Sequence, residues 1–159
     1  MYKKILAPLD GSTLSECSIE HIKDISTGCN VAEVILLKVV EKPRIDLPEY
    51  GSRQMIDEEL EREQKVAKET IKVAEDYLEN VAASLEKDNI EVKTVVIQID
   101  HGVAEAILDY ADNNQVDLII MSTHGRSGIS RFAFGSVADR VVNYSKVPVL
   151  TVVPSSCRI

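Results

Sequence analysis

The sequence predicts an α/β fold built on a doubly wound, five-stranded parallel sheet. Five short apolar segments rich in β-branched residues alternate along the chain with four segments of helical periodicity. The apolar segments are nearly continuous, as in strands that helices cover on both faces. Strict alternation with right-handed crossovers gives a doubly wound sheet. Because 159 residues suffice for one core, we expect a single domain over residues 1–159.

The five predicted strands are short and bounded by turn residues. They cover Lys3–Leu9, Glu33–Val40, Val92–Ile99, Val116–Met121 and Val147–Val153. The first is too short and too rich in β-formers for a helix, and Asp10-Gly-Ser ends it. The second reads GluValIleLeuLeuLysValVal, the branched pattern of a strand covered on both faces.

The first helix is predicted to follow the first strand directly. Ser12, Thr13 or Ser15 caps its start, and Gly28 ends it. Its apolar face consists of Leu14, Cys17, Ile22 and Ile25. Further along, Glu41–Arg53 contains two prolines and a glycine without periodicity, which predicts a long loop, either a plain surface excursion or a lid over a ligand.

The longest predicted helix runs from Gln54 to about Asp88. Its apolar residues recur at steps of three, four or seven on a charged background, namely Ile56, Leu60, Ala67, Ile71, Ala74, Leu78, Val81 and Leu85. The sevenfold step leaves a coiled coil as an alternative, but the small alanines favour packing on the sheet. Two shorter helices are predicted with inward faces of Ala104, Ile107, Leu108 and Ala111, and of Ala138, Val141 and Val142.

Composition and charge exclude several classes of protein. The 18 basic against 26 acidic residues give a net charge of −8, which disfavours binding to nucleic acid or anionic lipid. No apolar run is long enough for a membrane span, and Asp10 interrupts the first apolar stretch, so we expect no secretion signal and a cytoplasmic protein. Cys17, Cys29 and Cys157 lack metal or disulfide spacing, which indicates reduced, structural cysteines.

Two unusual loops follow predicted strands at the edge where open α/β sheets bind ligands. The first is AlaProLeuAspGlySer, in which Asp10 offers a carboxylate to ribose hydroxyls. The second runs from Ser122 to Ser136 and contains three glycines. Strand order 3-2-1-4-5 brings the two loops together at the reversal between strands one and four, whereas order 2-1-3-4-5 separates them. We therefore predict 3-2-1-4-5.

The glycine loop is a candidate phosphate cradle. Gly125, Gly128 and Gly135 permit close approach of the backbone, and the amides of Gly135, Ser136 and Val137 are predicted to point outward at a helix N-terminus. The alternative is that these residues only shape a turn and cap a helix. The P-loop pattern and Gly-x-Gly-x-x-Gly after the first strand are both absent, which disfavours a P-loop NTPase or a dinucleotide dehydrogenase.

These motifs resemble those of the universal stress protein family over essentially the whole chain. The family pattern is Gly, two residues, Gly, nine residues, Gly-Ser/Thr; Gly125, Gly135 and Ser136 match it, and Ser122 stands where the first glycine belongs. The resemblance implies a Rossmann-like fold of the adenine nucleotide alpha hydrolase type that binds ATP with Mg²⁺ carried by the nucleotide. It also implies the ligand-contacting positions, which are Pro8, Asp10, Val39, Ser122, Gly125, Gly135, Ser136 and Val137. Gly128 joins these candidates as the further glycine of the loop that permits close approach of the backbone.

No catalytic group is predicted. His124 lies in the glycine loop without a base partner or metal ligands at a suitable spacing, and no residue is placed to orient an attacking water. We therefore expect a regulator or sensor in the stress response, with at most weak ATP hydrolysis. The alternatives are a dimeric scaffold of the same fold that binds no nucleotide, and a slow ATPase.

The last predicted strand, Val147–Val153, forms the apolar edge of the sheet in this order, and exposed edges are usually paired or covered. We expect a homodimer through this strand, as the family resemblance also implies. The alternative is that the C-terminal tail shields the edge within one chain.

Overall fold

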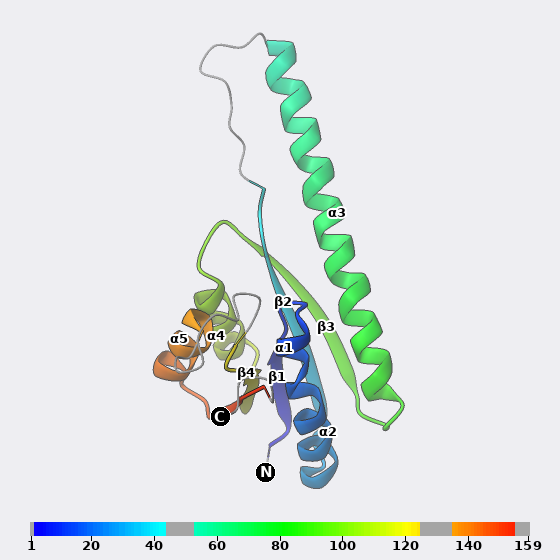
Figure 1. Cartoon of the computed structure of the whole chain (residues 1–159), viewed down its shortest axis with the longest axis vertical. Helices are drawn as coiled ribbons and strands as arrows, with labels where there is room; N and C mark the ends of the chain where they lie inside the picture. The colour runs from blue at the N-terminus through cyan, green and yellow to red at the C-terminus, as the bar shows by residue number, and fades with distance from the viewer. Residues whose placement is uncertain (1, 44–52, 125–134, 155–159) are drawn as a thin grey trace.

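The computed structural model describes residues 2–43, 53–124 and 135–154, which form one parallel sheet with helices on both faces (Figure 1). The strands are β1 (Lys4–Pro8), β2 (Glu33–Glu41), β3 (Val92–Ile99), β4 (Leu118–Ser122) and β5 (Val149–Val152). All four neighbouring pairs are parallel, and the order is β3-β2-β1-β4-β5. The predicted fold class and strand order are confirmed.

The described helices are α1 (Thr13–Glu16), α2 (Ser18–Cys29), α3 (Arg53–Glu86), α4 (Val103–Asn113) and α5 (Ser136–Tyr144). The single helix predicted after the first strand is split at Cys17, and its predicted cap Ser12 accepts a hydrogen bond from the Ser15 amide. The predicted stop at Gly28 is wrong. The helix continues to Cys29, and Asn30 ends it in the left-handed conformation (φ 52°), which asparagine tolerates better than most residues.

Two apolar layers pack on the sheet because side chains alternate between its faces. Residues such as Ile5, Leu36 and Ile120 face α2 and α3, and residues such as Leu6 and Ile119 face α4 and α5. The prediction that Val142 points inward is wrong, since 42% of it is exposed. It lies one residue, about 100° around the helix, beyond the buried Val141.

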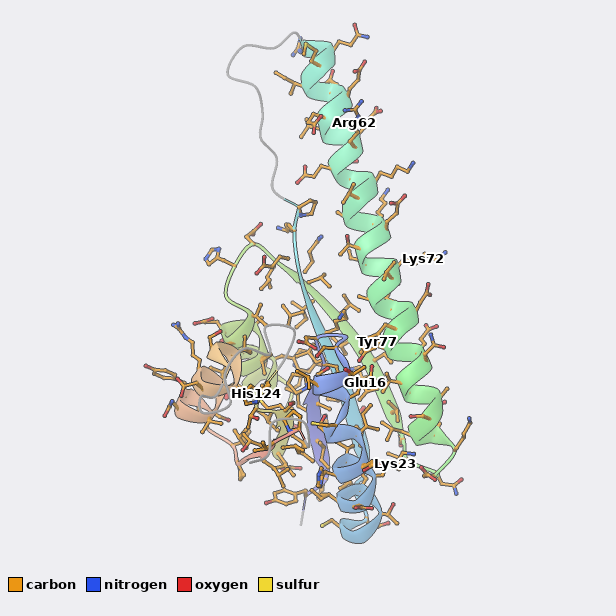
Figure 2. The ribbon with its side chains drawn as sticks, viewed as in Figure 1. Glu16, Lys23, Arg62, Lys72, Tyr77 and His124 are labelled. Atoms are coloured by element: carbon orange, nitrogen blue, oxygen red, sulfur yellow. The ribbon has the colours of Figure 1, made fainter. Side chains whose placement is uncertain are left out.

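Helix α3 is longer than the sheet that it covers. Its 34 residues span about 50 Å, whereas the nine residues of β2 span about 30 Å. Figure 1 shows its N-terminal part extending past the end of β2, and its buried positions begin only at Ala74. Packing on the sheet is therefore confirmed for the C-terminal half. Just beyond the end of α3, Asp88 forms an ion pair at 2.9 Å with Lys23 of α2, which Figure 2 labels.

Candidate functional site

A cleft of about 980 Å³ opens at the carboxyl ends of β1, β2 and β4. Strand order reverses between β1 and β4, which is the point where open α/β sheets bind ligands. Pro8, Asp10 and Val39 line the cleft from β1 and β2, and Ser122 lines it from the end of β4. The start of α5 and the middle of α3 form its other walls.

Asp10 is held in a tight turn directly after β1. Its Oδ1 accepts hydrogen bonds from the Ser12 amide (2.8 Å) and the Ser12 hydroxyl (2.6 Å). Gly11 between them has φ +89°, a conformation that side chains disfavour. The carboxylate predicted at this edge therefore belongs to a turn with a fixed backbone.

A lysine that the sequence analysis did not single out braces this turn. The Lys38 Nζ donates to the Asp10 carbonyl at 2.6 Å and lies 4.9 Å from the centre of the Tyr77 ring. A side chain at Gly11 would place its Cβ 2.7 Å from the same nitrogen. The sequence does carry a signal for this lysine, because it interrupts an apolar strand near the strand's carboxyl end. Alternation of side chains along β2 directs it to the face that α3 covers.

The Tyr77 hydroxyl links α3 to α1. It donates to Glu16 Oε1 at 3.0 Å, and Figure 2 shows the two side chains converging from their helices. Burial, together with the Glu16 carboxylate, raises the pKa of Tyr77 far above its ordinary value of 10.0. The phenol therefore stays protonated and acts as a structural donor.

Val39 presents backbone groups to the cleft because of its place in the ladder. Alternate residues of β2 direct their amides and carbonyls toward β1, as when Leu37 accepts from the Leu9 amide at 2.8 Å. Val39 is the next residue on that edge, and the β1 ladder has ended there. Its backbone therefore faces the rim of the cleft.

The exit of β4 is fixed by buried polar contacts. The Ser122 hydroxyl accepts from the His124 amide at 3.2 Å, and the Cys17 thiol lies 3.6 Å from it. The side chain of Thr123 bonds His124 Nδ1 at 2.8 Å, and the Thr123 amide donates to the Val152 carbonyl. These contacts fix the chain from Ser122 to His124 at the rim of the cleft.

The helix start at Gly135 differs in part from the prediction. The Gly135 amide is not directed outward, because it donates to the Thr123 carbonyl at 2.8 Å. A Cβ at Gly135 would lie 3.1 Å from that carbonyl oxygen, so glycine is needed for this close approach. The first-turn amides of Ser136 and Val137 have no acceptor within the helix, and both residues line the cleft. Gly125 and Gly128 lie outside the described residues.

The described part of the cleft is acidic. Asp10, Glu41 and Glu69 line it, and Lys38 is the only lysine or arginine among the described lining residues. The described residues contain no group of three or more His, Cys, Asp or Glu side chains able to hold a metal ion. In the same ranges no helix is both long enough and apolar enough to cross a membrane.

Comparison with known proteins places this architecture in a family. The model of the universal stress protein family matches residues 1–153. The chain belongs to the universal stress protein family. Two such proteins of Methanocaldococcus jannaschii, MJ0531 and MJ0577, are each 35% identical over 96% of this chain, covering 82% and 95% of their own lengths.

Solved structures of the family have the same fold. The structure of MJ0577 superposes with a TM-score of 0.79 at 31% identity and covers 98% of both chains. A family member from Arabidopsis thaliana, solved with AMP bound, has a TM-score of 0.62 at 14% identity, covering 97% of this chain and 93% of its own. One from Archaeoglobus fulgidus, in complex with dAMP, has a TM-score of 0.54 at 16% identity, covering 95% and 97%. Structural neighbours of this universal stress protein thus bind adenine nucleotides.

Proposed function

We propose that this universal stress protein binds ATP, with Mg²⁺ carried by the nucleotide, and acts as a regulator or sensor in the stress response. The observation that carries the proposal is the cleft at the β1/β4 switch point, where Asp10, the Val39 backbone and the first turn of α5 converge. Its volume of about 980 Å³ is at the upper end of the range for small-molecule sites.

Each wall of the cleft suits one part of a nucleotide. The Asp10 carboxylate suits hydrogen bonds from ribose hydroxyls, and the Val39 backbone suits an adenine edge, since both residues line the cleft. The amides of Ser136 and Val137, at the positive end of the α5 dipole, suit phosphate oxygens. Because the described lining holds three carboxylates and one lysine, a polyphosphate there needs Mg²⁺ to offset its charge.

Two neighbours were solved with AMP and with dAMP, which supports an adenine nucleotide as the class of ligand. The three phosphates of ATP are the more specific part of the proposal. Mass spectrometry of ligand retained by gently purified protein tests the class. Calorimetric titration with Mg-ATP and with AMP tests the phosphate number. If neither Mg-ATP nor AMP gives a heat of binding, the alternative of a scaffold that binds no nucleotide is favoured.

We infer a non-enzymatic role because no described residue is placed to activate water in the cleft. His124 lines it with Nδ1 bonded to the neighbouring Thr123 hydroxyl, and the sequence lacks the P-loop lysine pattern. We expect turnover far below the enzyme median of about 10 per second. A phosphate-release assay that measured enzyme-like rates, abolished by a point change in the cleft, would support the ATPase alternative.

We also propose a cytoplasmic homodimer joined through the β5 edge. Within the described sheet, β5 pairs with β4 on one side only, and an uncovered edge strand favours association. Light scattering should therefore give about twice the 17.6 kDa of one chain.

A further inference from the structure

Lys38 occupies a position in the cleft that neither the glycine-loop pattern nor the helix start explains. It lies on β2 next to Val39, and its side chain lies on the opposite face of the strand. There it meets the turn after β1 and the ring of Tyr77. It brings a positive charge to a cleft whose other described charged residues are carboxylates.

The bond from Lys38 constrains the backbone of the residue that is proposed to bind the sugar. The ammonium donates to the Asp10 carbonyl at 2.6 Å, while Oδ1 of the same residue accepts twice from Ser12. The residue is thus held at both its backbone and its side chain. Gly11 leaves the space that lets the ammonium approach the turn, since a Cβ there would lie 2.7 Å from it.

The ammonium is itself held by α3. The Tyr77 ring lies 4.9 Å from it, and the Tyr77 hydroxyl is anchored on Glu16 at 3.0 Å. A cation over an aromatic face is attracted by the ring quadrupole. The lysine is therefore restrained on two sides, and its side chain has a fixed place relative to the turn.

We propose that Lys38 is a positioning residue that makes the site prefer a ribose over a 2′-deoxyribose. By holding the Asp10 carbonyl it fixes the backbone from which the Asp10 carboxylate projects, while Ser12 holds Oδ1. A carboxylate in a fixed direction distinguishes a sugar with two hydroxyls from one with a single hydroxyl. This proposal rests on nucleotide binding in the cleft. Lys38 acts through Asp10 and needs no contact with the ligand.

The test compares Mg-ATP and Mg-dATP by calorimetric titration of the full chain, using Lys38→Met and the matched control Lys42→Met. Lys42 follows β2 by one residue and forms an exposed ion pair with Asp100 at 3.2 Å, so its loss changes the net charge equally without touching the turn. We expect the parent and Lys42→Met to prefer ATP by about tenfold. In Lys38→Met the preference should fall to within about twofold of unity.

A double-mutant cycle separates positioning from a general structural effect. Asp10→Asn should itself lose most of the preference, and adding Lys38→Met to it should lower the ratio no further. If Lys38→Met does not fold, Tyr77→Leu, which removes the ring beneath the ammonium, should lower the ratio in part. Thermal melts monitor folding of each variant.

Four results would overturn the proposal, and they are distinguishable. If the parent binds neither nucleotide, the proposed function fails and the proposal fails with it. If the parent binds both equally, or Lys38→Met keeps the parent's ratio together with the parent's affinities, ATP binding stands and the role of Lys38 is wrong. If Lys38→Met weakens both nucleotides equally, the lysine attracts phosphate and does not position Asp10.

Discussion

Replacing Gly135 with alanine should strain the junction between β4 and α5. The added Cβ would lie 3.1 Å from the Thr123 carbonyl oxygen, whereas ordinary contacts begin at 3.4 Å, so the start of α5 must move by a few tenths of an ångström. The same carbonyl accepts the Gly135 amide at 2.8 Å, so the movement also lengthens that bond. Overpacking of this size costs about 1–2 kcal/mol.

The expected result is a melting temperature lowered by about 2–8 °C, with native circular dichroism at 25 °C. Mg-ATP should bind about threefold to tenfold more weakly, because the amides of Ser136 and Val137 move with the helix. Gly28→Ala is the matched control. Nothing lies within 4 Å of the Cβ that it adds inside α2, so it should stabilise the protein by about 0.5 kcal/mol. Unchanged stability and affinity in Gly135→Ala would refute the reasoning.

Three further predictions concern packing, ionisation and assembly. Leu78→Ala should lower the free energy of unfolding, measured in urea, by about 3 kcal/mol because the Leu78 side chain is fully buried. Leu60 is 36% exposed, so Leu60→Ala should lower it by less than about 1 kcal/mol. Equal losses would contradict the packing of α3. Tyr77→Phe should cost about 1 kcal/mol at neutral pH. Because the folded protein raises the pKa of Tyr77, parent stability should fall above about pH 10, where the unfolded chain loses this proton first, and the variant should show a shallower fall. Val153→Lys, next to β5, should yield monomers in light scattering, whereas Met55→Lys, at a still more exposed site on α3, should remain dimeric. A dimeric Val153→Lys would argue against the β5 interface.

The sequence predicted what depends on local periodicity. All five strands lie at or within two residues of the predicted starts, and the helix predicted from Gln54 to about Asp88 spans Arg53–Glu86. The strand order was predicted by requiring two loops to meet at one edge. These features follow from apolar spacing and from rules of chain connection, and both can be read along the chain.

The errors arise where a tertiary contact decides the outcome. The Gly135 amide was predicted to face a ligand, but its acceptor is Thr123, twelve residues earlier, which no local pattern reveals. Lys38 was overlooked because its partners, the Asp10 carbonyl and the Tyr77 ring, come from distant parts of the chain. The helix stop was assigned to Gly28 because glycine is the usual choice, and Asn30 took that role instead.

Because α3 is longer than the sheet that it covers, its N-terminal and C-terminal parts should unfold locally with very different free energies. Its turns from Ala74 onward are buried, so their amides should exchange with solvent only when the whole domain unfolds. The turns before Ala74 contain no buried residue and should exchange by local fraying. Val66, Thr70 and Val73 lie in those labile turns and also line the cleft, so one wall of the site is its least protected part. Deuterium uptake along α3 should therefore rise steeply over the single turn before Ala74, and any ligand that contacts this wall will slow exchange there first.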